Sequence, residues 1–176
     1  MNSAEPALVL VGPMGAGKTS IGRRVARVLH TTFTDTDKIV VRDHGPIADL
    51  FVQYGEPRFR LLERRAVEEA LAKGGVIALG GGAVLDEQTR AHLRQHRVIL
   101  LTVAPHIVAS RVLGSQRPLL AGQDPMHEWK RITAERMPVY RGVADVTFDT
   151  SSGPLSDVVT EIVAWARTQN PTEEDR

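Results

Sequence analysis

The chain has 176 residues, of which 42% are hydrophobic and 24% charged, and its formal net charge is +1. This size and balance fit a single compact domain, and the near-neutral charge gives no general attraction to nucleic acid or to an anionic membrane. The sequence contains no cysteine, which excludes disulfides and thiolate metal sites. No apolar run has membrane-spanning length and residues 1–6 show no signal-peptide pattern, so we expect a cytoplasmic monomer without nucleic-acid or membrane partners.

Short apolar runs alternate along the chain with segments of helical periodicity. We predict strands at 7–11, 31–35, 76–79, 97–103 and 143–148. Helices are predicted at 18–29, 38–53 with a break near 45–46, 59–71, 86–93, 105–113, 126–140 and 155–166. This alternation predicts an α/β fold with a parallel sheet covered by helices on both faces, in which ligands bind at the carboxyl ends of the strands. The polar residues 168–176 lack apolar periodicity, and we expect them to form a disordered tail.

A phosphate-binding motif follows the first predicted strand. Residues 12–19 read Gly-Pro-Met-Gly-Ala-Gly-Lys-Thr and fit the P-loop pattern G-x-x-x-x-G-K-[ST]. In such a loop the backbone N–H groups surround phosphate oxygens, Lys18 reaches the β- and γ-phosphates, and the Thr19 hydroxyl ligates Mg²⁺. The alternative, a glycine-rich turn with a surface lysine, is disfavoured because the motif lies between a buried strand and an amphipathic helix. The candidate ATP-binding residues here are Gly15, Ala16, Gly17, Lys18, Thr19 and Ser20.

Two carboxylates follow the second predicted strand, in the sequence Asp35-Thr36-Asp37. One of them could help to hold Mg²⁺ while the other orients a substrate hydroxyl. The alternative is that one of the pair only caps the next helix, because Asp and Thr favour helix N-termini. From the residues alone, both interpretations stay open.

Three consecutive glycines, Gly80, Gly81 and Gly82, follow the third predicted strand. Glycine lets a backbone approach a ligand closely and present its N–H groups to an anion or an oxygen. The alternative is a loose loop. Ordering three consecutive glycines costs conformational entropy, however, and this cost favours a functional role for them.

Arginines supply the candidate anion-binding side chains. Arg60 has Glu63 three residues later on the same predicted helix, a spacing at which the two side chains can pair. Arg117 lies in the Gly- and Pro-containing segment 114–125, and Arg136 precedes Met-Pro-Val-Tyr. An exposed ion pair contributes little, but phosphoryl transfer spreads negative charge that an arginine can stabilise.

In combination, these motifs resemble the shikimate kinases, a nucleoside-monophosphate-kinase-like family of P-loop proteins. The residues that carry the resemblance are in the family's order and span about 8–140. They are the P-loop, Asp35-Thr36-Asp37, Gly45 with 47–51, Gly55-Glu56, Phe59-Arg60, Glu63, Gly80–Val84, Arg117–Leu120, and Arg136 with Pro138 and Tyr140. The resemblance implies a three-layer α/β/α P-loop fold with a five-stranded sheet, a lid at 114–125 and a substrate-binding subdomain at 36–64.

The resemblance also implies a role for each candidate residue. Lys18, Asp37 and Arg117 would be catalytic: Lys18 holds phosphates, Asp37 grips the reacting hydroxyl, and Arg117 reaches the transferring phosphate. Thr19 and Asp35 would hold Mg²⁺, directly or through water. The shikimate site would comprise Asp37, Arg60, Gly80, Gly81, Gly82 and Arg136, with Glu63 bracing Arg60. ATP would also contact Arg111, Arg117 and Pro154.

Two segments depart from the family pattern. Pro57 and Arg58 stand where acidic or polar residues are common, but Pro57 suits the first turn of a helix. The segment 149–154 lacks the basic residue often found in the family's adenine loop, so adenine must be held mostly by backbone and shape.

The implied reaction is ATP-dependent phosphorylation of the 3-hydroxyl of shikimate, which gives 3-phosphoshikimate and ADP on the route to chorismate and the aromatic amino acids. A kinase for gluconate or a similar hydroxy acid is the alternative within enzymes, and the order of motifs disfavours it. A non-catalytic nucleotide-binding module is disfavoured because Lys18, Asp37 and Arg117 are all present.

Overall fold

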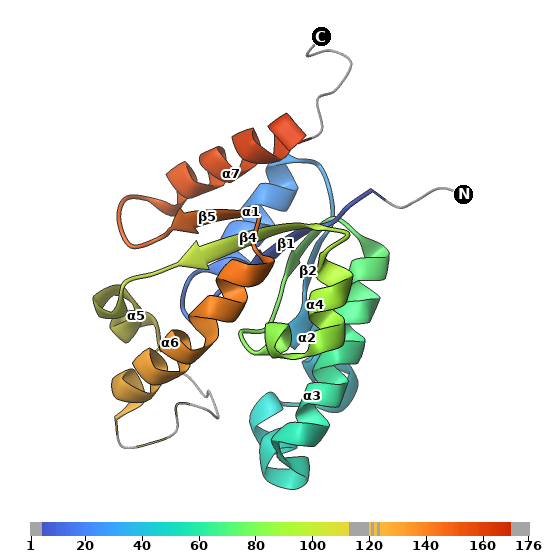
Figure 1. Cartoon of the computed structure of the whole chain (residues 1–176), viewed down its shortest axis with the longest axis vertical. Helices are drawn as coiled ribbons and strands as arrows, with labels where there is room; N and C mark the ends of the chain where they lie inside the picture. Colours follow the sequence, from blue (N-terminus) through green and yellow to red (C-terminus); the bar gives the residue numbers. More distant parts are fainter. Residues whose placement is uncertain (1–4, 113–119, 121, 123, 170–176) are drawn as a thin grey trace.

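The computed structural model describes residues 5–112, 120, 122 and 124–169. Its centre is a parallel sheet of five strands in the order β2-β3-β1-β4-β5 (Figure 1). The strands are β1 (Leu8–Val11), β2 (Phe33–Asp35), β3 (Val76–Ala78), β4 (Arg97–Thr102) and β5 (Val146–Asp149). The predicted three-layer α/β/α architecture is therefore confirmed. Each strand overlaps its predicted segment, although β5 begins three residues later than predicted.

Helices follow the strands along the chain and cover both faces of the sheet (Figure 1). They are α1 (Lys18–Val28), α2 (Thr36–His44), α3 (Ile47–Lys73), η1 (Ala83–Leu85), α4 (Glu87–Leu93), α5 (Pro105–Val112), α6 (Pro125–Val143) and α7 (Leu155–Gln169). Strand β1 shows the two faces directly, because its residues alternate between two apolar clusters. Val9 and Val11 pack with residues of α2, α3 and α4, whereas Leu8 and Leu10 pack with residues of α1 and α7.

The boundaries of three helices differ from the prediction. Helix α3 joins two segments that were predicted separately, with a kink at Gly55, whose φ of 77° lies in the left-handed region that favours glycine. Helix α6 continues to Val143 although Pro138 lies inside it. Helix α7 includes residues 168 and 169, so the expected tail starts at least two residues later; 170–176 lie outside the described residues.

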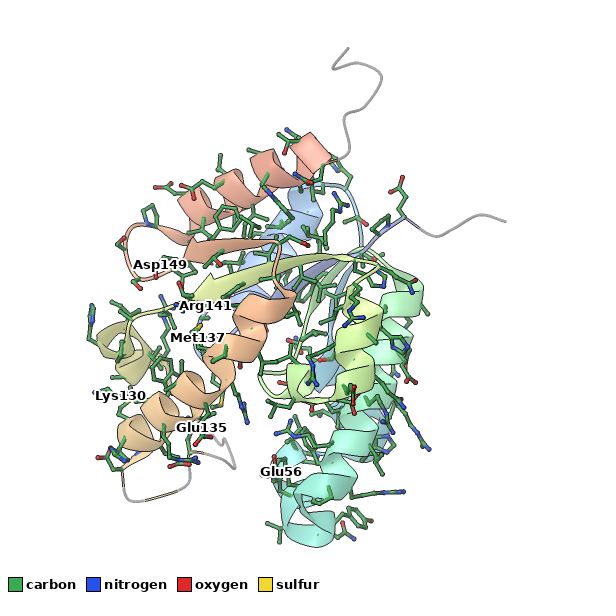
Figure 2. The ribbon with its side chains drawn as sticks, in the orientation of Figure 1. Glu56, Lys130, Glu135, Met137, Arg141 and Asp149 are labelled. Atoms are coloured by element: carbon green, nitrogen blue, oxygen red, sulfur yellow. The ribbon has the colours of Figure 1, made fainter. Side chains whose placement is uncertain are left out.

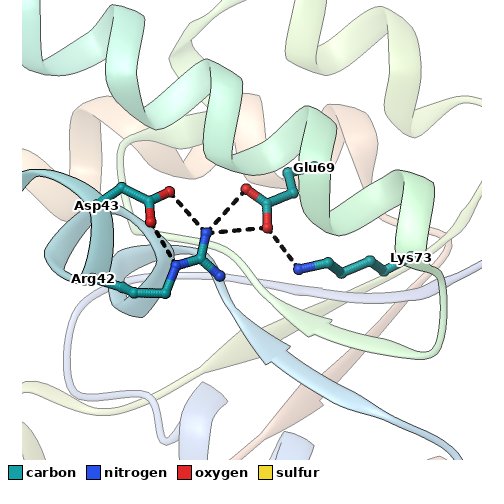
Figure 3. Close-up of polar contacts among 4 residues, drawn as sticks. All are labelled: Arg42, Asp43, Glu69 and Lys73. Carbon is teal, nitrogen blue, oxygen red and sulfur yellow. Dashed lines mark hydrogen bonds and ion pairs between the residues drawn. The ribbon is translucent and has the colours of Figure 1, made fainter.

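A surface network of four charged side chains joins the end of α2 to α3 (Figure 3). Arg42 Nε lies 2.5 Å from Asp43 Oδ1, and its guanidinium also donates to Glu69 at 3.2 Å, while Lys73 Nζ lies 2.6 Å from the same carboxylate. The Arg42 guanidinium holds the pKa of Asp43 below its usual value. Exposed pairs of this kind contribute little to stability, so the packing of α2 on α3 rests mainly on their apolar contacts.

The sheet order brings the predicted motifs to one place. Strand β3 lies between β1 and β2, and Ala78 is in register with both Leu10 and Asp35. The segments that leave these three strands at their carboxyl ends are therefore neighbours.

Gly12 directly follows β1 with a φ of 141°, and a Cβ atom there would collide with the carbonyl oxygen of Leu101. Within the described residues, no helix is long and apolar enough to cross a membrane.

Candidate active site

A cavity of about 550 Å³ opens at the carboxyl ends of β1, β2 and β3. It brings together most of the predicted site residues, namely Gly15, Gly17, Lys18, Thr19, Ser20, Asp35, Asp37, Arg60, Glu63, Gly81, Gly82, Arg111 and Arg136. Six apolar residues complete the lining and were not predicted as site residues: Met14, Ile47, Phe51, Phe59, Ala78 and Leu79. Of the described candidates, Ala16, Gly80 and Pro154 do not line this cavity. Arg117 and most of the segment 114–125 lie outside the described residues.

The P-loop forms one wall of the cavity. Helix α1 begins at Lys18, directly after Gly17, so its N-terminal N–H groups and the positive end of its dipole face the cavity. Lys18 Nζ donates to the carbonyls of Gly12 at 2.6 Å and of Pro13 at 3.0 Å, which holds the ammonium over the loop. This arrangement of amides and ammonium suits the phosphates of a nucleotide.

Asp35 caps helix α2, as one of the two interpretations predicted, and it also contacts the P-loop. Its Oδ1 caps helix α2 by accepting from the backbone N–H of Asp37 at 3.0 Å and of Lys38 at 3.4 Å. Its Oδ2 accepts from the Thr19 hydroxyl at 2.7 Å, which joins α2 to the P-loop. The cap leaves Asp37 in the first turn of α2, where it lines the cavity.

A hydroxyl and a carboxylate placed in this way fit Mg²⁺. The ion usually binds one or two protein oxygens and completes its shell with substrate phosphates and water. Thr19 and Asp35 both line the cavity beside the P-loop, so nucleotide phosphates would lie within reach of the same ion. Among the described residues, no group of three or more His, Cys, Asp or Glu side chains forms a separate metal cluster.

The three glycines let charged side chains lie against the backbone. A Cβ atom on Gly80 would lie 2.6 Å from Asp37 Oδ1 and 2.7 Å from Glu63 Oε1, closer than real contacts allow. A Cβ atom on Gly82 would collide with the guanidinium of Arg60. Gly80 and Gly82 therefore lie where protein side chains approach the backbone closely, whereas a Cβ atom on Gly81 would make only ordinary contacts at 3.6 Å or more. The approach of a ligand to this backbone stays a prediction.

Arg60 is held between two carboxylates of its own helix, α3. Its NH1 lies 2.6 Å from Glu63 Oε2, and its NH2 lies 2.8 Å from Glu56 Oε1. Glu63 is only 3% exposed, and burial raises its pKa above the usual value although Arg60 acts in the opposite direction. The sequence analysis did not predict Glu56 as a partner of Arg60, although the two residues are four apart on one helix, a spacing at which side chains can pair. Figure 2 shows Glu56 in the part of α3 that contains the kink.

Helix α6 contributes Arg136 to the lining of the cavity. Its buried residues Trp129, Ile132, Arg136 and Tyr140 recur at helical spacing, and Arg136 is 8% exposed. The Tyr140 hydroxyl donates to the Gly81 carbonyl at 2.5 Å, and burial raises the pKa of Tyr140, which keeps it a donor. Arg136 and Arg60 therefore present two cations to the same part of the cavity.

The expected adenine side of the site lies around the P-loop and the segment after β5. Arg111 NH1 donates to the Gly15 carbonyl at 2.9 Å, so this arginine rests on the P-loop. The Thr150 hydroxyl lies 3.0 Å from the Ala16 carbonyl, which places the segment that contains Pro154 next to the loop. Pro154 accepts from the N–H of Asp157 at 3.1 Å and precedes helix α7.

Comparison with known proteins identifies the family. A family model described as shikimate kinase matches residues 14–167, which is most of the chain. The chain belongs to the shikimate kinase family. It is 41% identical over 162 residues to a shikimate kinase of Corynebacterium efficiens, covering 91% of this chain and 96% of that protein. It is 48% identical over 152 residues to a shikimate kinase of Thermobifida fusca, covering 85% of this chain and 88% of that protein.

Solved structures agree with this assignment. A shikimate kinase from Acinetobacter baumannii in complex with shikimate has a TM-score of 0.90 at 33% identity, covering 95% of this chain and 96% of that one. A gluconokinase from Sinorhizobium meliloti has a TM-score of 0.61 at 20% identity, covering 93% of each chain. The second likeness concerns the fold alone, so the shikimate kinase family, and not the gluconate alternative, is the one to which the sequence points.

Proposed function

We propose that this chain transfers the γ-phosphoryl group of ATP to the 3-hydroxyl of shikimate, giving 3-phosphoshikimate and ADP in aromatic amino-acid biosynthesis. The observation that carries the proposal is one cavity lined both by the P-loop with Lys18 and by the arginines Arg60 and Arg136. Asp37 lines the same cavity. Such a cavity suits a triphosphate donor and an acceptor that has both a carboxylate and a hydroxyl.

On the donor side, the P-loop amides and Lys18 would bind the β- and γ-phosphates. The Thr19 hydroxyl and the Asp35 carboxylate would hold Mg²⁺, directly or through water, and the ion when bound supplies positive charge to the phosphates. Ser20 and Ala16 would complete the phosphate site, and Arg111 with the segment before Pro154 would bound the adenine. Adenine contacts there would be mostly backbone and shape, because 149–154 contains no basic residue.

On the acceptor side, Arg60 and Arg136 would clamp the carboxylate of shikimate. Glu63 braces Arg60 through its 2.6 Å ion pair, so the guanidinium is oriented before the substrate arrives. The backbone of Gly80, Gly81 and Gly82 would lie against the ring, with Tyr140 fixing the Gly81 carbonyl. Asp37 would accept a hydrogen bond from the 3-hydroxyl and aim its oxygen at the γ-phosphorus.

Closure of the site would exclude water before transfer. We propose that residues 36–64, which carry Asp37 and Arg60, act as the substrate-binding subdomain, and that 114–125 acts as the lid. Arg117 would then stabilise the charge that develops on the transferring phosphoryl group. One chain supplies both halves of the site, and we propose that the enzyme works as a monomer.

The decisive test is an ADP-release assay with ATP, Mg²⁺ and a panel of hydroxy acids. We expect turnover with shikimate and none with gluconate. Arg136→Ala should lower kcat/KM for shikimate, with a loss of about 2–5 kcal/mol of transition-state stabilisation. The reason is that the variant removes the arginine partner of the buried shikimate carboxylate. Arg136→Lys is the matched variant, since it keeps the charge and loses the planar fork. Turnover of gluconate without turnover of shikimate would overturn the proposal.

A further inference from the structure

Side chains from α5, α6 and the segment after β5 donate hydrogen bonds to backbone carbonyls of the P-loop. Trp129 Nε1 of α6 donates to the Met14 carbonyl at 2.8 Å, and Arg111 NH1 of α5 donates to the Gly15 carbonyl at 2.9 Å. The Thr150 hydroxyl, which follows β5, lies 3.0 Å from the Ala16 carbonyl. The carbonyls of three consecutive P-loop residues are thus each met by a donor from far away in the sequence.

Peptide planarity gives these contacts a consequence for the inner side of the loop. The carbonyl of one residue and the N–H of the next belong to the same plane and point in opposite directions. A donor that holds the Met14 carbonyl therefore also sets the direction of the Gly15 N–H. By the same geometry, a donor on the Ala16 carbonyl sets the direction of the Gly17 N–H.

The contact of Arg111 differs from the other two. The Gly15 carbonyl shares its plane with the Ala16 N–H, which already donates to the Pro13 carbonyl at 3.2 Å inside the loop. Arg111 is also exposed, so water competes for its hydrogen bond. This plane is held without Arg111, whereas the other two planes depend on donors outside the loop.

Trp129 and Thr150 are well placed to hold those two planes. Each is 2% exposed, so their hydrogen bonds are shielded from water. The Thr150 hydroxyl is also 3.0 Å from the Thr102 carbonyl, but that carbonyl already accepts the Thr150 N–H at 2.8 Å. A carbonyl can accept two hydrogen bonds, so the hydroxyl proton lies within reach of both carbonyls. When it is donated to the Ala16 carbonyl, the Thr102 carbonyl still has the Thr150 N–H as its partner.

We infer that Trp129 and Thr150 are positioning residues for nucleotide binding: they hold the Met14 and Ala16 carbonyls outward so that the Gly15 and Gly17 N–H groups point at phosphate. This inference rests on the proposed function of the P-loop. It adds two residues outside the lining of the cavity, and it gives a role to the buried indole N–H and the buried hydroxyl, which both donate to the P-loop. Affinity for phosphates then depends on the hydrogen bonds that Trp129 and Thr150 donate to the P-loop carbonyls.

The test measures ADP, AMP and shikimate affinities separately by calorimetry on the full chain. Trp129→Phe keeps the ring and removes the donor, and Thr150→Val keeps the shape and removes the hydroxyl. We expect each variant to bind ADP about 10-fold more weakly, the loss of roughly one buried hydrogen bond. Shikimate affinity should be unchanged, and AMP, which lacks the β-phosphate, should lose much less than ADP. Thr150→Ser, the matched control, should bind ADP like the wild type.

Fluorescence provides a second measurement, because Trp129 and Trp165 are the two tryptophans of the chain. In a Trp165→Phe variant the emission comes from Trp129 alone, and ADP should shift it while shikimate should not. Wild-type affinity for ADP in both Trp129→Phe and Thr150→Val would overturn the inference, as would equal losses for ADP, AMP and shikimate. Failure of the wild type to bind ADP at all would instead overturn the proposed function.

Discussion

Glu63 is a buried carboxylate whose ionisation is opposed by its surroundings, and it lines the cavity. Its carboxylate is nearly inaccessible, and Asp37, which also carries negative charge, adds to the cost of ionising it. The Arg60 guanidinium offsets part of this cost at 2.6 Å. The enzyme thus holds a buried carboxylate at an energetic cost, and the ion pair orients Arg60, the proposed ligand of the substrate carboxylate.

The raised pKa of Glu63 predicts how stability depends on pH. Between the unfolded pKa of about 4.3 and the higher folded value, the folded chain binds more protons than the unfolded chain, so this group's contribution to the free energy of unfolding falls as pH rises. Glu63→Gln removes the titration. The wild type should therefore lose stability relative to Glu63→Gln as pH rises from about 4 toward 7, measured by urea unfolding.

Arg60 stays charged throughout this range, so its altered surroundings in the variant add only a constant offset. A difference in unfolding free energy that is flat, or that grows with pH, would contradict the raised pKa. At neutral pH, the same variant should show a higher KM for shikimate with a smaller change in KM for ATP, because only the acceptor clamp loses its brace.

Gly80 should be intolerant of even one methyl group. In Gly80→Ala the new Cβ would press on Asp37 Oδ1 and Glu63 Oε1, and a displacement of about 1 Å of a reacting group can cost about 100-fold in rate. We therefore expect kcat/KM for shikimate to fall by about 100-fold or more in the coupled assay. Gly142→Ala is the control, because nothing lies within 4 Å of its Cβ position in α6. Equal activity in the two variants would show that the close approach at Gly80 is not required.

At the scale of elements, Thr36 fixes the end of β3 against the start of α2. It is fully buried, its hydroxyl accepts the Gly80 N–H at 3.0 Å, and it lies 3.5 Å from the Ala78 carbonyl. The Thr36 side chain therefore connects the start of α2, which contains Asp37, to the glycine segment that follows β3. Thr36→Val keeps the shape but leaves the Gly80 N–H without a partner.

We expect Thr36→Val to lower the free energy of unfolding by about 1–3 kcal/mol, the usual cost of a buried unsatisfied donor. KM for shikimate should rise as the glycine segment shifts. Thr36→Ser keeps the hydroxyl and should recover most of the affinity for shikimate, although the lost methyl costs some stability. Urea unfolding gives the free energy of unfolding, and the ADP-release assay gives KM for shikimate. Identical values for the Val and Ser variants would contradict the role of the Thr36 hydroxyl.

Element order and strand identity could be predicted because parallel strands read as short apolar runs and helices as periodic ones. The P-loop and the three glycines each follow such a run, and Asp35-Thr36-Asp37 comes at the end of a short β-prone segment, so their meeting at one sheet edge was predictable. The donors Trp129 and Thr150 were not, because they contact carbonyls 115 and 134 residues away. No local pattern marks such contacts, which depend on how α6 crosses the sheet and where β5 ends.

At the scale of the whole molecule, the two halves of the cavity come from different parts of the chain. In the proposed function, the donor half would consist of the P-loop and the start of α1, and the acceptor half of α2, α3, the glycine segment and α6, all of which contribute to the lining of the cavity. Lys18 belongs to the first half and Arg136 to the second. This separation predicts that each half can be disabled while the other still binds its ligand.

Thermal unfolding with single ligands tests the separation. A ligand at about 100 times its Kd stabilises the folded state by about 2.7 kcal/mol, which raises Tm by several degrees in a domain of this size. Lys18→Ala should lose most of the rise produced by ADP and keep the rise produced by shikimate, whereas Arg136→Ala should show the reverse. Each shift is compared with the variant's own Tm, so a change in baseline stability does not enter. If either variant lost both shifts, the cavity would have to be treated as one cooperative site rather than two halves, because a single broken contact would then have disabled binding at a distance.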